Sequence, residues 1–128
     1  KVACIAPSEQ LLPGVQSSVE ATLLAKMGER GQLGTKVYID GPLALDVAIN
    51  KEAAATKKLD NPVVGDADCL VFPNIDAGNV FFKSCTKFGG AELAAMVMGA
   101  KVPCVLTSRG DSKKTKMYSI ALACLSAK

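Results

Sequence analysis

The sequence contains no histidine, and this absence excludes several kinds of catalytic site. Its 128 residues also lack tryptophan, and only 5% of them are aromatic. Without an imidazole, the chain cannot by itself build a Ser-His-Asp triad, a Cys-His pair or an HExxH zinc site. Any chemistry that it performs must use carboxylates, hydroxyls, lysine and arginine side chains or backbone dipoles, or a group supplied from elsewhere.

Cysteine is present but not in a pattern that binds metals or forms disulfides. The five cysteines include no CxxC pair. Four of the five lie in apolar runs, as buried free thiols do. This usage predicts a reducing, cytoplasmic location and no metal site. The sequence also lacks a signal peptide and an apolar run long enough to span a bilayer, so no membrane partner is expected.

Charge is unevenly distributed along the chain, although the net charge is only +3. Residues 59–82 include four aspartates and no basic residue, whereas residues 101–128 include six basic residues and one acidic residue. A small polyanionic ligand would suit the second segment. Because no basic stripe alternates with aromatic residues, nucleic acid is not an expected partner.

Apolar β-type runs alternate with helical patterns, about six strands with about five helices. The strands that can be placed are 1–6, 36–39, 68–72, 94–98 and 101–106, and the helices that can be placed are 17–30, 42–58, 80–88 and 112–125. Ser17 or Ser18 is the predicted N-cap of the first helix, and Pro42 is predicted to lie in the first turn of the second helix. The side chains of the first helix that are predicted to face the core are Val19, Leu23, Leu24 and Met27. The alternation predicts an α/β fold with a largely parallel sheet flanked by helices.

Polar loops follow three of the predicted strands, where parallel sheets bind ligands. They are DGP after Ile39, PNIDAGN after Phe72 and TSRGDS after Leu106. In the third loop, a strand ends in Ser108-Arg109-Gly110 and a helix follows directly, which is a plausible anion site. The alternative is that Ser108 and Arg109 merely end a strand and that Asp111 or Ser112 caps the helix.

The second loop offers a further set of candidate ligand-binding residues. Asp76, Gly78 and Asn79 either cap the following helix or orient a ligand, and Gly78 would allow backbone to approach an anion. Lys83 falls one turn inside the predicted helix and could reach the same loop.

Four longer segments carry a family resemblance: KMGERGQ, DGPLALDVAIN, VGDADCLVFPNIDAGNVFFKS and GAKVPCVLTSRGDS. In this order and spacing they resemble the phosphate acetyl/butyryltransferase family, and DGPLALD with VLTSRGDS resembles its phosphate butyryltransferase branch. The resemblance implies two α/β domains and transfer of an acyl group between coenzyme A and phosphate. This chain would match the C-terminal part: residues 1–100 as the second domain, and residues 101–128 as a strand and helix returning to the first.

The family's N-terminal half, which adds arginines for phosphate and coenzyme A, has no counterpart in this sequence. The implied partners are therefore that half together with acyl-CoA, acyl phosphate and inorganic phosphate. Coenzyme A would be a substrate, with no tightly bound cofactor. A homo-oligomer is also expected, since half of such an enzyme should expose apolar surface.

The resemblance also suggests roles for individual residues. Arg109 and the backbone N–H groups of Gly110, Asp111 and Ser112 would bind phosphate or the developing oxyanion. Ser108 would position the thiol or donate to the carbonyl oxygen. From the other loop, Asn79 with the 76–78 turn would orient the acyl phosphate.

The sequence does not decide which group acts as the general base. Thr115 stands where acetyl-transferring relatives carry an aspartate seven residues after the motif serine. Asp111 is the carboxylate nearest to Ser108 in the sequence and is one candidate. Otherwise, the phosphate dianion would act as the base, or the thiolate would attack without a base.

Three other functions remain possible from the sequence. The first is a non-catalytic module that binds coenzyme A or phosphate. The second is a metal- and nicotinamide-dependent dehydrogenase, against which the sequence has no GxGxxG fingerprint and no obvious cluster of carboxylates for a divalent metal. The third is a purely structural α/β domain within an oligomer.

Overall fold

The computed structural model describes residues 1–127, which form two compact units. The first unit is Lys1–Val80, and the second begins at Phe81. The boundary predicted near residue 100 concerns the two domains of the family and stays a prediction.

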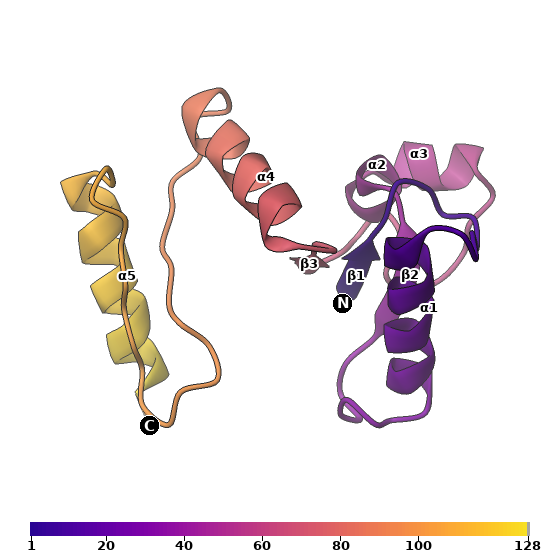
Figure 1. The fold of residues 1–128 in the computed structure, drawn as a ribbon, viewed down its shortest axis with the longest axis horizontal. Helices are drawn as coiled ribbons and strands as arrows, with labels where there is room; N and C mark the ends of the chain where they lie inside the picture. Colours follow the sequence, from indigo (N-terminus) through magenta and orange to yellow (C-terminus); the bar gives the residue numbers. More distant parts are fainter. Residues whose placement is uncertain (128) are drawn as a thin grey trace. The chain divides into compact units, whose positions relative to one another are not determined.

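The first unit is built on a three-stranded parallel sheet (Figure 1). Its strands are β1 (Val2–Ile5), β2 (Ile39–Leu43) and β3 (Cys69–Val71), in the order β2-β1-β3. Helix α1 (Gln16–Glu29) connects β1 to β2 and packs against β2. Because strands joined through helices pair in parallel, the α/β prediction is confirmed.

The core of this unit consists of small and medium-sized aliphatic side chains. Helices α2 (Leu45–Ile49) and α3 (Lys51–Thr56) follow β2 and contribute to it. The buried cluster contains Ala3, Leu43, Val47, Ala48, Ala54 and Val63. Such side chains allow close approach of helices and sheet, as the scarcity of aromatic residues suggests.

The prediction that Pro42 opens a helix is wrong. Pro42 lies inside β2 after a cis peptide bond from Gly41, and the strand continues to Leu43, which pairs with Ile5. The DGP segment is therefore part of a strand and not a loop at its end. The predicted helix 42–58 is also divided at Asn50, whose side chain accepts hydrogen bonds from the N–H groups of Glu52 and Ala53.

Helix α1 ends as predicted but begins differently. Gly31, with a φ of +70°, follows its last turn. At its start Val15 occupies the cap position, whereas Ser18 is buried inside the helix. The Ser18 hydroxyl donates to the Gln10 carbonyl and accepts from the Leu12 N–H, so it fastens the preceding loop.

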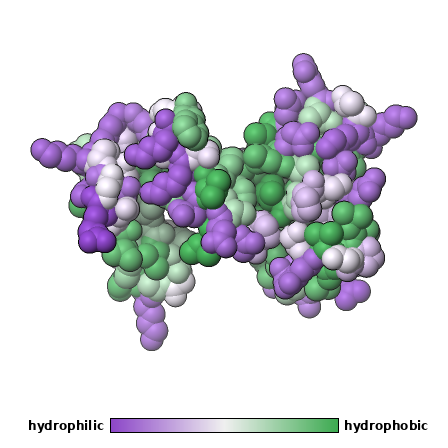
Figure 2. Space-filling view, turned by 45° about the horizontal axis from the view of Figure 1, so that its top comes forward, coloured by the Kyte–Doolittle hydropathy of each residue, from purple (hydrophilic) through white to green (hydrophobic). Residues whose placement is uncertain are grey.

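The predicted core stripe of α1 is wrong in part. Val19, Leu23 and Met27 are 39%, 59% and 37% exposed. Figure 2 shows that apolar residues reach the surface among hydrophilic ones on the face that it presents. No helix among residues 1–127 is both long and apolar enough to cross a membrane.

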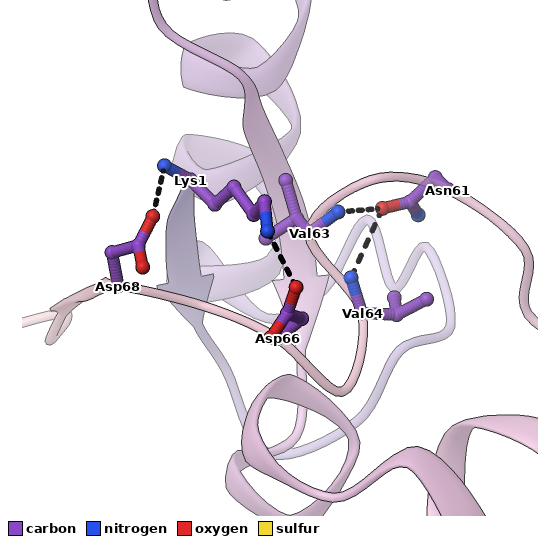
Figure 3. A network of polar contacts seen from close by, with 6 residues as sticks. All are labelled: Lys1, Asn61, Val63, Val64, Asp66 and Asp68. Atoms are coloured by element: carbon purple, nitrogen blue, oxygen red, sulfur yellow. Dashed lines mark hydrogen bonds and ion pairs between the residues drawn. The ribbon is translucent and has the colours of Figure 1, made fainter.

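The loop of residues 61–68 attaches the start of β3 to β1 (Figure 3). The Asn61 side chain accepts from the N–H groups of Val63 and Val64, at 2.9 and 3.2 Å. The Lys1 ammonium group bonds the Asp66 carboxylate, which raises the pKa of Lys1 and lowers the pKa of Asp66. These contacts order a loop that contains no regular structure.

The second unit holds most of the candidate site. Helix α4 (Ile75–Lys87) starts in the first unit and continues into the second, which also contains α5 (Lys113–Ser126). The strands predicted at 94–98 and 101–106 are wrong: these segments share a single antiparallel bridge, Val97–Cys104. A strand needs a ladder of hydrogen bonds to a neighbour, and apolar alternation alone does not supply one.

The cysteines are free thiols in different surroundings. Cys4 is buried, Cys85 and Cys104 are partly exposed, and Cys69 and Cys124 are exposed. The prediction that four of them are buried is therefore wrong. Burial raises the pKa of the Cys4 thiol.

Candidate functional site

The segment from Ser108 to Ser112 forms a closed turn immediately before α5. The Asp111 carboxylate accepts a hydrogen bond from the Ser108 N–H at 2.8 Å, and the Asp111 N–H donates to the Ser108 carbonyl at 3.1 Å. The Gly110 N–H donates to the Ser108 hydroxyl oxygen at 3.4 Å. The structure thus brings Ser108 and Asp111 together and leaves Arg109 exposed between them.

Two of the backbone donors predicted for phosphate, those of Gly110 and Asp111, make hydrogen bonds within this turn. A ligand that recruited them would have to displace these contacts.

Ser112 is the N-cap of α5. Its hydroxyl oxygen accepts from the Thr115 N–H at 3.1 Å, and its hydroxyl lies 3.1 Å from the Thr115 hydroxyl. A serine at this position satisfies one of the unpaired N–H groups of the first turn. Of the two predicted candidates for the cap, Ser112 is therefore confirmed, while Asp111 closes the preceding turn.

The residues of the second predicted loop lie in a helix. Helix α4 begins at Ile75, before the predicted start at residue 80, and the Asn74 side chain accepts from the Ala77 N–H at 2.9 Å. Asp76, Gly78 and Asn79 consequently occupy its first turns, within the first unit. A side chain at Gly78 would make ordinary contacts, the nearest being Phe72 Cβ at 3.6 Å, so the helix itself does not require glycine there.

A cavity of about 410 Å³ lies entirely within the second unit. It is bounded by the later turns of α4, the chain after that helix and the start of α5. Its lining residues are Phe82, Lys83, Thr86, Lys87, Ala91, Leu93, Gly110, Asp111, Ser112 and Thr115. Four predicted site residues, Lys83, Gly110, Asp111 and Ser112, therefore share one cavity. Ser108 and Arg109 precede it along the chain and are not among the lining residues.

The lining combines positive charge with hydroxyl groups. Lys83 and Lys87 come from successive turns of α4, and the Lys83 ammonium group lies 4.5 Å from the centre of the Phe82 ring. This cation–π contact holds the ammonium group against the helix. Thr86, Ser112 and Thr115 contribute hydroxyls. Such a set of groups can bind a phosphate or another compact anion.

The sequence interpretation missed Lys87 and Thr86, and it noted Thr115 only as the position where acetyl-transferring relatives carry an aspartate. One signal was available, because Lys83 and Lys87 are spaced i, i+4 and so share a helix face. The approach of α5 to that face depends on tertiary structure, which no local pattern contains.

The chain after α4 is fastened to α5 within this unit. Glu92 pairs with Lys114, and this hydrogen bond raises the pKa of the Lys114 ammonium group. The Ala95 N–H donates to the Ser119 hydroxyl oxygen at 3.0 Å. Ser119 is fully buried and donates in turn to the Thr115 carbonyl at 2.8 Å.

The first unit has a larger cavity, of about 550 Å³, beside the start of β2. Its lining includes Asp40 of the DGP segment, but none of the site residues assigned from the other two loops. Across residues 1–127 no group of three or more cysteine, aspartate and glutamate side chains is arranged to hold a metal ion.

In fold, the chain is of the phosphotransacylase type. It matches a branched-chain phosphotransacylase from Enterococcus faecalis with a TM-score of 0.85 and 41% identity, over 96% of this chain and 44% of that one. A phosphotransacetylase from Streptococcus pyogenes matches with a TM-score of 0.76 and 30% identity, over 98% and 38% of the two chains.

Residues 1–124 match the family described as phosphate acetyl/butaryl transferase, and the chain belongs to this family. It is 49% identical to a phosphate butyryltransferase of Clostridium beijerinckii, over 99% of this chain and 42% of the relative. It is 43% identical to a phosphate acetyltransferase of Thermotoga maritima, over 99% of this chain and 43% of that protein. The chain thus spans about two fifths of the length of the relatives that it matches.

Proposed function

We propose that this chain is the C-terminal part of a phosphate acyltransferase. The complete enzyme transfers a short acyl group, butyryl or acetyl, between coenzyme A and inorganic phosphate. The observation that carries this proposal is the cavity of the second unit, where two lysines, the Ser112 cap and an apolar wall meet. Membership of the phosphate acetyl/butaryl transferase family supports the same reaction.

The reaction requires stabilisation of negative charge more than proton transfer by histidine. A phosphate oxygen attacks the thioester carbonyl carbon of acyl-CoA, the C–S bond breaks, and the coenzyme A thiolate leaves. In reverse, the thiolate attacks the acyl-phosphate carbonyl and phosphate departs. Both directions pass through a tetrahedral oxyanion, so fixed cationic and N–H donors lower the barrier.

Arg109 is the residue that we assign to phosphate or to the developing oxyanion, because its guanidinium offers a planar set of donors. The turn that Asp111 closes limits the conformations of Arg109. Ser108 positions the thiol or donates to the carbonyl oxygen.

The remaining site residues bind substrate. Lys83, Gly110 and Ser112 act from the cavity, and Asp76, Gly78 and Asn79 act from the first turns of α4. Coenzyme A is a substrate and not a resident cofactor.

Asp111 is the candidate general base, and its contact with the Ser108 N–H bears on that role. A carboxylate that is needed for a backbone turn is not free to rotate toward a substrate. The alternative is that the phosphate dianion or the thiolate reacts without a protein base. An Asp111→Asn variant should flatten the alkaline-going limb of the pH–rate profile if Asp111 is the base.

The complete enzyme acts in the cytoplasm and as a homo-oligomer. Free cysteines, two of them exposed, suit a reducing compartment. The exposed apolar side chains of α1, Val19, Leu23 and Met27, suit a surface that is covered in an assembly.

A non-catalytic module that binds coenzyme A or phosphate is the second candidate. The observation that favours it is the hydrogen bond from the Ser108 N–H to the Asp111 carboxylate, which ties the candidate base to the backbone.

The test is release of thiol from butyryl-CoA in the presence of phosphate, with acetyl-CoA alongside. It is run on the 128-residue chain and on the full-length protein that contains it. Phosphate-dependent turnover by the full-length protein supports the acyltransferase. Binding of coenzyme A without turnover, even at full length, favours the module.

A further inference from the structure

Three apolar side chains, Phe82, Ala91 and Leu93, line the same cavity as the lysines. Resting on the function proposed above, we propose that they form an acyl-chain subsite that sets the chain-length preference of the enzyme. An acyl phosphate has a dianionic head and a short hydrocarbon tail. A cavity with a cationic part and an apolar part is complementary to both.

The size of the cavity fits this assignment. Its volume of about 410 Å³ falls in the range of small-molecule sites. It exceeds the space needed by phosphate alone, so the apolar lining has room for a tail. Each methylene group transferred from water to such a lining favours binding about fourfold, the ratio that corresponds to about 0.8 kcal/mol.

The apolar wall, formed by Phe82, Ala91 and Leu93, is held in place from both sides. A subsite that discriminates between acyl chains of different length requires such a fixed wall. The Ala91 N–H donates to the Cys85 carbonyl at 3.0 Å, so the chain after α4 turns back onto that helix. Beyond Leu93, the Ala95 N–H donates to the buried Ser119 hydroxyl of α5. The segment that carries Ala91 and Leu93 is therefore fixed against two helices. Figure 1 shows this segment running beside α5.

The charged part of the cavity orients the tail. Because the Lys83 ammonium group lies over the Phe82 ring, the anionic head would be bound next to the apolar wall. A tail that leaves the phosphate then extends along Phe82 toward Ala91 and Leu93. The contacts that distinguish acetyl from butyryl are those with the last two carbons.

Two variants of the full-length enzyme change the wall in opposite directions. Ala91→Leu adds bulk at an exposed position where the fold tolerates it. It should lower kcat/KM for butyryl-CoA about tenfold relative to acetyl-CoA. Leu93→Ala removes bulk and should raise kcat/KM for hexanoyl-CoA about tenfold relative to butyryl-CoA. Leu125→Ala is the matched control, since Leu125 is 85% exposed on α5 and outside the cavity.

The outcomes separate the subsite from the proposed reaction. Opposite shifts in chain-length preference, with unchanged ratios in Leu125→Ala, support the subsite. Turnover by all variants with unchanged ratios overturns the subsite and leaves the acyltransferase standing. Absence of phosphate-dependent turnover with acetyl-, butyryl- and hexanoyl-CoA in the unmodified full-length protein overturns the acyltransferase itself.

Discussion

Ser112 has two roles, as the cap of α5 and as a group that lines the cavity, and two substitutions separate these roles. Ser112→Ala removes the hydroxyl that accepts from the Thr115 N–H at 3.1 Å. Loss of such a cap costs about 1 kcal/mol. Because 1.4 kcal/mol corresponds to a factor of ten in an equilibrium constant, the equilibrium constant for opening the first turn of α5 should rise about fivefold. Ser112→Asp keeps an acceptor at the cap and suits the positive end of the helix.

The same aspartate places a negative charge where the substrate phosphate is expected. Charges of about −2 and −1 at about 6 Å in water repel by about 1.4 kcal/mol. Ser112→Asp should therefore raise KM for phosphate at least about tenfold while leaving the cap intact.

Hydrogen exchange at the Thr115 amide and steady-state kinetics of the full-length enzyme measure the two effects independently. Unchanged exchange in Ser112→Ala would refute the capping argument. An unchanged KM for phosphate in Ser112→Asp would refute an anion site in this cavity.

Three further predictions concern the first unit. A methyl group at Gly41 would lie 2.7 Å from Cys4 Cβ, so Gly41→Ala should lower the free energy of unfolding by about 1–3 kcal/mol, seen as a lower urea midpoint. Burial raises the pKa of the Cys4 thiol, so iodoacetamide should alkylate exposed Cys69 well before Cys4 in the native protein, and equal rates would contradict that burial. The pKa of Glu9 is lowered first by its own backbone N–H and then by Lys57, so Lys57→Met should raise it part of the way toward its usual value in an NMR titration. Because a lowered carboxyl pKa stabilises the fold only above that pKa, the stabilities of this variant and the unmodified protein should converge as the pH falls.

The parts of the fold that the sequence predicts correctly are those fixed by local chemistry. The apolar runs of β1 and β3 give strands, Gly31 ends α1 in a left-handed conformation, and Ser112 caps α5. Each depends on a preference of a few neighbouring residues, which a single sequence contains.

Most of the errors occur where a distant partner decides the structure. Pro42 favours the first turn of a helix locally, yet pairing of Leu43 with Ile5 keeps it in a strand. One error is local: Asn79 and Gly78 are common in turns, but the Asn74 cap starts the helix before them. The two apolar segments before Ser108 alternate like strands and still form only one bridge.

The sequence predicts only part of the candidate site. Helix position and the family resemblance identify Lys83 and Ser112, and the cavity contains both. The sequence does not identify Lys87 and Leu93, because their place in the cavity depends on how the chain after α4 folds against α5.

In the proposed reaction, the loop before α5 stabilises the charge that develops during phosphate-dependent acyl transfer. The most direct measurement is kcat/KM for phosphate with butyryl-CoA in the full-length protein and in its Arg109→Ala variant. Arg30→Ala is the matched control, since Arg30 is an exposed arginine at the end of α1. A fall of about a hundredfold in Arg109→Ala alone, the scale of losing one charge-stabilising donor, is the predicted result. Equal activity of the two variants would contradict this role of the loop.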